Sequence, residues 1–63
     1  MKYVIIGYGR VGSRTARVLQ SEGHEVTIVE RDQAKIDRAS DAGFTVVTGD
    51  GSEESTLEQA DID

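Results

Sequence analysis

The 63-residue sequence contains no cysteine, no proline and a single histidine. The absence of cysteine excludes disulfides and thiolate metal sites, and one histidine cannot form a zinc site. No apolar stretch approaches the ~20 residues that a membrane-spanning helix needs, and no signal peptide opens the chain. We therefore expect a cytoplasmic protein with a small hydrophobic core that no cross-link reinforces.

Basic charge is also scarce, since seven Lys and Arg stand against twelve Asp and Glu, for a net charge of −5. This balance argues against a surface that binds nucleic acid or an acidic membrane. We therefore expect no nucleic-acid partner.

Short apolar runs alternate with amphipathic stretches along the chain. This pattern predicts strands at residues 2–6, 25–29 and 44–48, helices at residues 10–22 and 33–42, and a third helix after Ser52. The second strand is too apolar to be half solvated, which favours a parallel sheet covered on both faces. With right-handed crossovers, the order predicts an α/β fold, a Rossmann-like half domain over residues 1–63 whose parallel strands have the order 3-2-1.

The first predicted helix carries Val11, Thr15, Val18 and Leu19 at helical spacing, and we expect these residues to face the sheet. Gly23 is expected to cap the end of this helix.

In the second helix, Asp32 is a predicted N-cap, Ile36 and Ala39 are expected to face inward, and Gly43 ends the helix. In the third helix, Leu57 and Ala60 are expected to face the sheet.

Three glycines with the spacing G-x-G-x-x-G follow directly on the first strand and precede the first helix. In this context Gly7 allows the tight turn, Gly9 lets a pyrophosphate approach the backbone, and Gly12 lets the helix pack close to the strand. The first turn of the helix then offers N–H groups and a positive dipole end to phosphates. The motif predicts a dinucleotide-binding site.

Glu30 stands at the end of the second strand, where a carboxylate can accept hydrogen bonds from the ribose hydroxyls of adenosine and would repel a 2′-phosphate. This favours NAD(H), or adenine nucleotides such as ATP, ADP and AMP, over NADP. Arg31 could stack on adenine, meet a 2′-phosphate, or simply be exposed.

Other residues of the same sheet edge have two interpretations each. Asp50 could accept a hydrogen bond from the adenine amino group or belong to a turn that leads into a helix. Arg10 could contact phosphate, or it could form a solvated face with Arg14 and Arg17. Tyr8 could shield a ligand or cover the strand end.

No catalytic group is recognisable in the sequence. Ser13, Thr15, Ser40 and Ser55 have no base near them in any arrangement that the pattern suggests, and His24 lies in a predicted loop. We therefore expect a binding protein rather than an enzyme.

Three segments carry a resemblance to a known family: residues 4–12 (VIIGYGRVG), 29–32 (VERD) and 47–52 (VTGDGS). They resemble the N-terminal domain of Trk-type potassium uptake regulators, also called the RCK or KTN domain. The third segment is the most specific, because a strand that ends in Gly-Asp-(Gly/Ala) before an acidic, Ser/Thr-capped helix is typical of these domains.

The resemblance implies a cytosolic regulatory module that binds NAD(H) or adenine nucleotides and, through dimers and larger rings, gates a membrane potassium transporter or channel. It places the phosphate-binding turn at Gly7, Tyr8, Gly9, Arg10 and Val11, the ribose acid at Glu30, and the adenine contact at Asp50 and Gly51. Members of the family continue with a fourth strand, which this sequence lacks.

Two other readings remain open. The chain could be the nucleotide-binding half of an NAD-dependent dehydrogenase, or an assembly fragment that binds no nucleotide. Because the first strand lacks its usual neighbour, we also expect a homodimer in which this strand pairs antiparallel with its copy, in the order 3-2-1-1′-2′-3′. The first and third helices would pack across this seam, where we expect Leu57 and Ile62 to be buried, and a swap of the third helix is the alternative route to a dimer.

Overall fold

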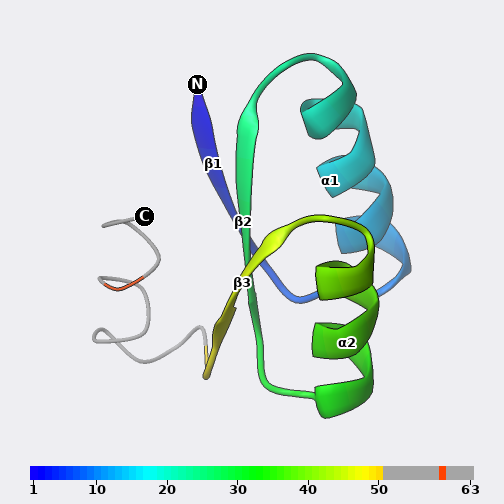
Figure 1. The fold of residues 1–63 in the computed structure, drawn as a ribbon, viewed down its shortest axis with the longest axis vertical. Helices are drawn as coiled ribbons and strands as arrows, with labels where there is room; N and C mark the ends of the chain where they lie inside the picture. The colour runs from blue at the N-terminus through cyan, green and yellow to red at the C-terminus, as the bar shows by residue number, and fades with distance from the viewer. Residues whose placement is uncertain (51–58, 60–63) are drawn as a thin grey trace.

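The computed structural model describes residues 1–50 and residue 59 (Figure 1). Its elements in chain order are β1 (Lys2–Ile6), α1 (Arg10–Ser21), β2 (Glu25–Glu30), α2 (Gln33–Asp41) and β3 (Thr45–Thr48). The predicted third helix, with Leu57 and Ala60, lies outside the described residues. Both α1 and α2 lie on the same side of the sheet, as right-handed crossovers require (Figure 1).

The three strands form one parallel sheet with β2 in the centre, which confirms the predicted order 3-2-1. Ile28 in β2 lies opposite Ile5 of β1 and Val46 of β3. Every residue of β2 after Glu25 is buried. The apolar character of this strand therefore reflects cover on both faces, as predicted.

The predicted helix ends are confirmed with small shifts. The Asp32 side chain accepts a hydrogen bond from the Lys35 amide at 3.1 Å and so caps α2. Gly23 follows α1 with a φ of +87° and Gly43 follows α2 with a φ of +91°, both left-handed conformations that favour glycine. Ala39 of α2 is fully buried, as expected.

The predicted inward face of α1 is confirmed at Leu19, which packs against the core, and is wrong at Val11, Thr15 and Val18, which are exposed. Val11 and Val18 are 79% and 57% exposed, while Ala16 is completely buried. The reason is the close approach of the helix to the turn after β1, where a Cβ at Gly12 would lie 2.6 Å from the Gly7 carbonyl oxygen. Gly12 and Ala16, two small residues four positions apart, form the surface of α1 that packs inward. Val11 and Val18 lie beside this surface and remain exposed.

The core lies mainly between the sheet and the two helices. Its buried members are Tyr8, Ala16, Val26, Ile28, Ala39 and Phe44. On the opposite face, Val29 and Val47 form a second, smaller cluster. Among the described residues, β1 pairs only with β2, and Val4 and Ile6 remain 39% and 61% exposed.

Candidate functional site at the carboxyl ends of the strands

The turn between β1 and α1 has the backbone that the glycine motif predicts. Gly7 has a φ of +94°, and its amide donates to the Val29 carbonyl at 2.8 Å, which continues the β1–β2 pairing into the turn. At Gly9, the N-cap of α1, an added Cβ would meet no atom within 4 Å. The backbone at Gly9 is therefore open to a ligand, whereas Gly12 is a glycine because the turn presses against it.

Glu30 ties this turn to the end of β2. Its Oε1 accepts the Tyr8 amide at 2.8 Å, and its Oε2 accepts the amides of Arg31 at 3.0 Å and Asp32 at 2.9 Å. The side chain is only 8% exposed. A buried carboxylate with three amide donors is satisfied by the protein itself, and it fixes the distance between the glycine turn and the β2–α2 turn.

These contacts also set the ionisation of Glu30. The hydrogen bond from the Asp32 amide, with those from Tyr8 and Arg31 and the nearby charge of Lys35, holds the pKa of the Glu30 carboxyl below its usual value. Burial acts in the opposite direction and is outweighed. Glu30 is therefore a carboxylate at neutral pH.

A hollow of about 240 Å³ lies at this edge of the sheet. We call it the carboxyl-end hollow, and it is lined by Ile6, Gly7, Val29, Glu30, Arg31, Gly49 and Asp50. The Arg31 guanidinium lies 3.6 Å from the Asp50 carboxylate across this edge. The structure thus brings together four residues of the predicted site, Gly7, Glu30, Arg31 and Asp50, whereas Gly51 lies outside the described residues.

The remaining predicted residues are placed differently. The Tyr8 side chain is buried against Phe44, with ring centroids 5.9 Å apart, so that it covers the end of β1 on the helix side. Only its backbone belongs to the glycine turn. The Val11 side chain is exposed and does not line the carboxyl-end hollow.

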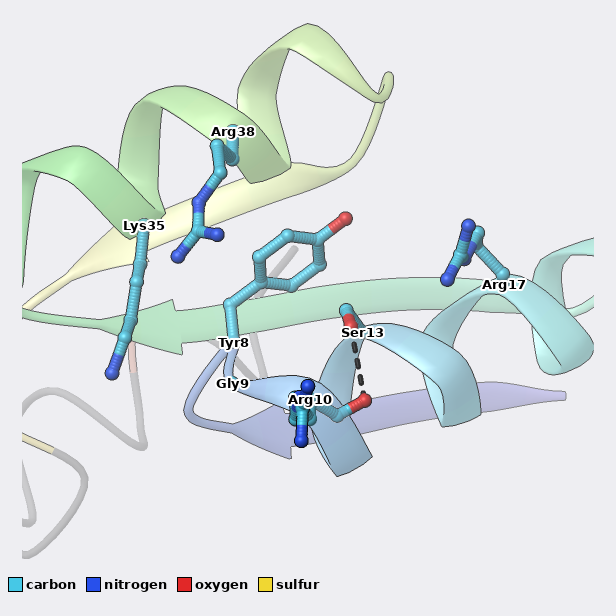
Figure 2. Close-up of a pocket in the computed structure, with 7 residues that line it drawn as sticks. All are labelled: Tyr8, Gly9, Arg10, Ser13, Arg17, Lys35 and Arg38. Carbon is cyan, nitrogen blue, oxygen red and sulfur yellow. Dashed lines mark hydrogen bonds between the residues drawn. The ribbon is translucent and has the colours of Figure 1, made fainter.

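A second hollow, of about 440 Å³, lies between α1 and α2. Its lining includes three residues of the predicted phosphate-binding turn, Tyr8, Gly9 and Arg10, together with residues that the sequence did not predict as part of a site. Figure 2 shows Arg10 and Arg17 coming from α1, and Lys35 and Arg38 coming from α2 toward Tyr8. Arg14, which the sequence groups with Arg10 and Arg17, does not line it. The spacing i, i+3, i+7 of Arg10, Ser13 and Arg17 is the signal that could have revealed it.

No group of three or more His, Cys, Asp or Glu within residues 1–50 is arranged to hold a metal ion. In the same part of the chain, no helix has the length and apolarity needed to cross a membrane.

A parallel βαβ unit with a glycine turn at its first crossover, an acid at the end of β2 and a hollow between them defines the Rossmann class of folds. A family model for the TrkA-N domain matches residues 3–63. The chain therefore belongs to the TrkA-N domain family.

Individual proteins agree with this assignment. The chain is 42% identical over 64 residues to the "Trk system potassium uptake protein TrkA" of Streptomyces coelicolor, a match that covers 100% of this chain and 29% of that protein. It is 40% identical over 63 residues to the "Trk system potassium uptake protein TrkA homolog" of Pyrococcus horikoshii, covering 98% of this chain and 28% of that protein. The chain thus spans less than a third of the length of these relatives.

A shorter match reaches an enzyme. Over 28 residues the chain is 57% identical to the "UDP-N-acetylmuramoylalanine--D-glutamate ligase" of Prochlorococcus marinus, which covers 44% of this chain and 6% of that protein. Unlike the TrkA matches, this similarity does not extend over the whole chain.

Proposed function

We propose that this chain is a nucleotide-binding regulatory module of a potassium uptake system, with NAD(H) as its ligand, ATP, ADP or AMP as further ligands, and NADP(H) as a weaker one. The observation that carries the proposal is the glycine turn, whose backbone is open at Gly9 and whose Gly7 lines the carboxyl-end hollow. Its support in the comparisons is the TrkA-N family and the potassium uptake proteins that match the whole chain.

In this proposal the pyrophosphate lies over Gly9, facing the first turn of α1. Helix geometry leaves the amides of that turn without intrahelical partners, and the first hydrogen bond of the helix is that from the Ser13 amide to the Gly9 carbonyl at 2.9 Å. The adenosine lies in the carboxyl-end hollow, with its base toward Asp50 and Gly51. Arg10 and Val11 flank the phosphates.

Glu30 has fewer acceptor positions left for the ribose than the sequence analysis expected. A carboxylate offers about four acceptor positions, and three amides already use Glu30. About one position is left for a ribose hydroxyl. Because Glu30 and Asp50 both line the carboxyl-end hollow, a 2′-phosphate placed there would face two carboxylates, which is the basis for weaker NADP(H) binding.

Titration calorimetry of the chain with NAD⁺, NADH, NADP⁺, ATP and ADP tests this function. Gly9→Ala should keep the fold, because its Cβ meets no protein atom, and should weaken NAD⁺ binding about tenfold or more by occupying the space of the pyrophosphate. Gln20→Ala, exposed at the far end of α1, is the control and should bind NAD⁺ like the unsubstituted chain. Unchanged NAD⁺ affinity in Gly9→Ala would refute the phosphate site, and equal affinity for NAD⁺ and NADP⁺ would refute the role of Glu30.

We further propose that the protein acts on the cytoplasmic side of a membrane potassium transporter, as a binding partner rather than an enzyme. Its support is that the relatives matching the whole chain carry the name of uptake proteins. NADH oxidation by the pure chain with a small carbonyl compound would contradict this and would favour the dehydrogenase reading.

We also propose a homodimer of this single domain, formed through β1. Its support is the apolar strand edge that pairs only with β2 among the described residues. Antiparallel pairing of β1 with its copy would give a six-stranded sheet in the order 3-2-1-1′-2′-3′. Sedimentation equilibrium at tens of micromolar tests it, and a compact, cooperatively folded monomer would refute it.

A further inference from the structure

An ion pair joins the ends of β2 and β3 at the carboxyl-end hollow. Arg31 directly follows β2, and Asp50 is the second residue after β3. The Gly49 amide donates to the Glu30 carbonyl at 3.0 Å, so that the pairing of the two strands continues past β3 and brings Asp50 beside Arg31. The Arg31 guanidinium then lies 3.6 Å from the Asp50 carboxylate. The position of this arginine is therefore set by the neighbouring strand as well as by its own.

The partner of Arg31 decides what this arginine can offer a nucleotide. In Rossmann folds that take NADP, an arginine near the end of the second strand accommodates the 2′-phosphate. In this chain the guanidinium at that place already has a carboxylate partner. A 2′-phosphate would have to displace or share that partner, so it would gain less than it gains from an arginine without one.

The two carboxylates of the carboxyl-end hollow are held in different ways. Glu30 is buried, and three backbone amides donate to it, so its carboxylate cannot turn away without leaving those donors unpaired. The Asp50 and Arg31 side chains lie at the rim, where 41% and 77% of them are exposed. The charge at the rim can therefore be changed without opening the buried hydrogen bonds of Glu30.

We infer that Asp50 sets the preference of this site between nucleotides with and without a 2′-phosphate, and that it does so by holding Arg31. The inference rests on the proposed function, because it concerns the ribose end of a bound nucleotide. With Asp50 in place, the charged lining of the hollow is two carboxylates and one guanidinium, so a 2′-phosphate meets net negative charge. Without the Asp50 carboxylate, the Arg31 guanidinium is released to the ligand and balances the charge of Glu30. Glu30 by itself then no longer disfavours NADP(H).

Calorimetric titration of Asp50→Asn with NAD⁺ and NADP⁺ tests this role, with the ratio of the two affinities as the readout. Both ligands carry the same adenine, so a changed contact between the base and residue 50 cancels in the ratio. Asp50→Asn should shift the ratio toward NADP⁺ about fivefold or more. Asp41→Asn is the matched control, because it removes the same charge from an exposed position outside the hollow, and it should leave the ratio within about twofold. Circular dichroism checks the fold, and Asp50→Ser, which removes the same charge with a different side chain, should give the same shift.

Arg31→Ala separates the action of Asp50 through Arg31 from the action of its own charge. In the otherwise unsubstituted chain, Arg31→Ala should change the ratio about twofold or less, because the guanidinium is already paired at an exposed rim. In the Asp50→Asn background, the same substitution should reverse the shift toward NADP⁺. This difference between the two backgrounds is the coupling that a double-mutant cycle measures.

Three results would overturn the inference while NAD⁺ binding, and with it the proposed function, stands. One is an unchanged ratio in Asp50→Asn. Another is an equal effect of Arg31→Ala in both backgrounds, which would mean that Asp50 acts by its own charge alone. The third is an equal shift in Asp41→Asn, which would indicate the net charge of the chain. Absence of NAD⁺ binding by the unsubstituted chain would instead refute the proposed function and this inference together.

Discussion

β1 and β2 pair residue for residue, yet their surroundings differ. Four of the five residues of β1 are apolar, so it is the more apolar strand, but Ile6 remains 61% exposed. In β2, Ile28 is completely buried. The difference shows that the place of a strand in the sheet, rather than its composition, decides how much it buries. Among the described residues, β2 lies at the centre of the sheet between β1 and β3, whereas β1 pairs with a strand on one side only.

Two isoleucines allow a matched test of this contrast. Ile28→Ala should lower the free energy of unfolding by ~2–5 kcal/mol, because it leaves a cavity in the core. Ile6→Ala removes the same atoms from an exposed position and should cost about 0.5 kcal/mol or less in a monomer. Urea unfolding followed by circular dichroism in dilute solution measures both. Equal losses would show that β1 is as well covered as β2, and a loss that grows with protein concentration would locate a dimer contact at Ile6.

Glu30→Gln probes the end of β2. The amide nitrogen of Gln cannot accept the backbone donors that Glu30 holds, so the variant should lose ~1–3 kcal/mol at neutral pH. The folded pKa of Glu30 lies below its unfolded value. Its contribution is therefore full above the unfolded pKa, about 4.3 for Glu, and is lost as pH falls through the folded pKa.

The pH dependence gives this prediction its control. Unfolding curves at neutral and acid pH should show that part of the acid destabilisation disappears in Glu30→Gln. Glu25→Gln, at the exposed start of the same strand, leaves the three hydrogen bonds to Glu30 in place. This variant should still lose stability at acid pH. An unchanged acid profile in Glu30→Gln would contradict the role of the carboxylate as a tie between the turns.

Gly12→Ala tests how α1 meets the turn after β1. The added Cβ would lie 2.6 Å from the Gly7 carbonyl oxygen, a clash with backbone that only a shift of the helix can relieve. Alanine gains up to ~1 kcal/mol in helix propensity, and we expect the clash to outweigh it, for a net loss of about 1–2 kcal/mol. Thermal unfolding compares it with Gly9→Ala, which has open space. A more stable Gly12→Ala would show that the contact between helix and turn is loose.

Asp32→Ala should destabilise the fold less than Ile28→Ala and no more than Glu30→Gln or Gly12→Ala. It removes the side chain that caps α2 directly after β2 and should cost about 1 kcal/mol. Asp41→Ala, at the last residue of α2, removes a negative charge that the helix dipole disfavours, so it should be neutral or slightly stabilising. Denaturant unfolding of the two variants distinguishes them, and an equal loss in both would mean that the charge of the chain, rather than the cap, is being measured.

The elements that sequence predicted well depend on single residues whose conformation is constrained. Gly7 must adopt a positive φ to turn the chain, Asp32 accepts an amide of the helix it precedes, and β2 is apolar on both faces because it is covered on both faces. Strand order followed from the handedness of crossovers. These rules depend either on single residues or on the order of strands and helices along the chain, and both can be taken from the sequence.

What sequence did not predict depends on how elements approach one another. Periodicity identified an apolar face on α1, but two surfaces of that helix carry apolar residues, and the small pair Gly12 and Ala16 decided which one meets the sheet. The hydrogen bonds from backbone amides to Glu30 depend on turn conformations that the spacing of residues along the sequence does not encode. The hollow between α1 and α2 is lined by residues of two helices from different crossovers, so no single stretch of sequence contains it.

The three hydrogen bonds that backbone amides donate to Glu30 have a consequence for how this site can evolve. One carboxylate faces the carboxyl-end hollow and also holds the Tyr8 amide of the glycine turn. A protein lineage in which another residue replaces Glu30, and so changes the ligand preference of the site, loses the hydrogen bond to the Tyr8 amide in the same step. Substitutions that secure the turn in another way must come first, so the order of changes, and not only their final set, is constrained by a single side chain.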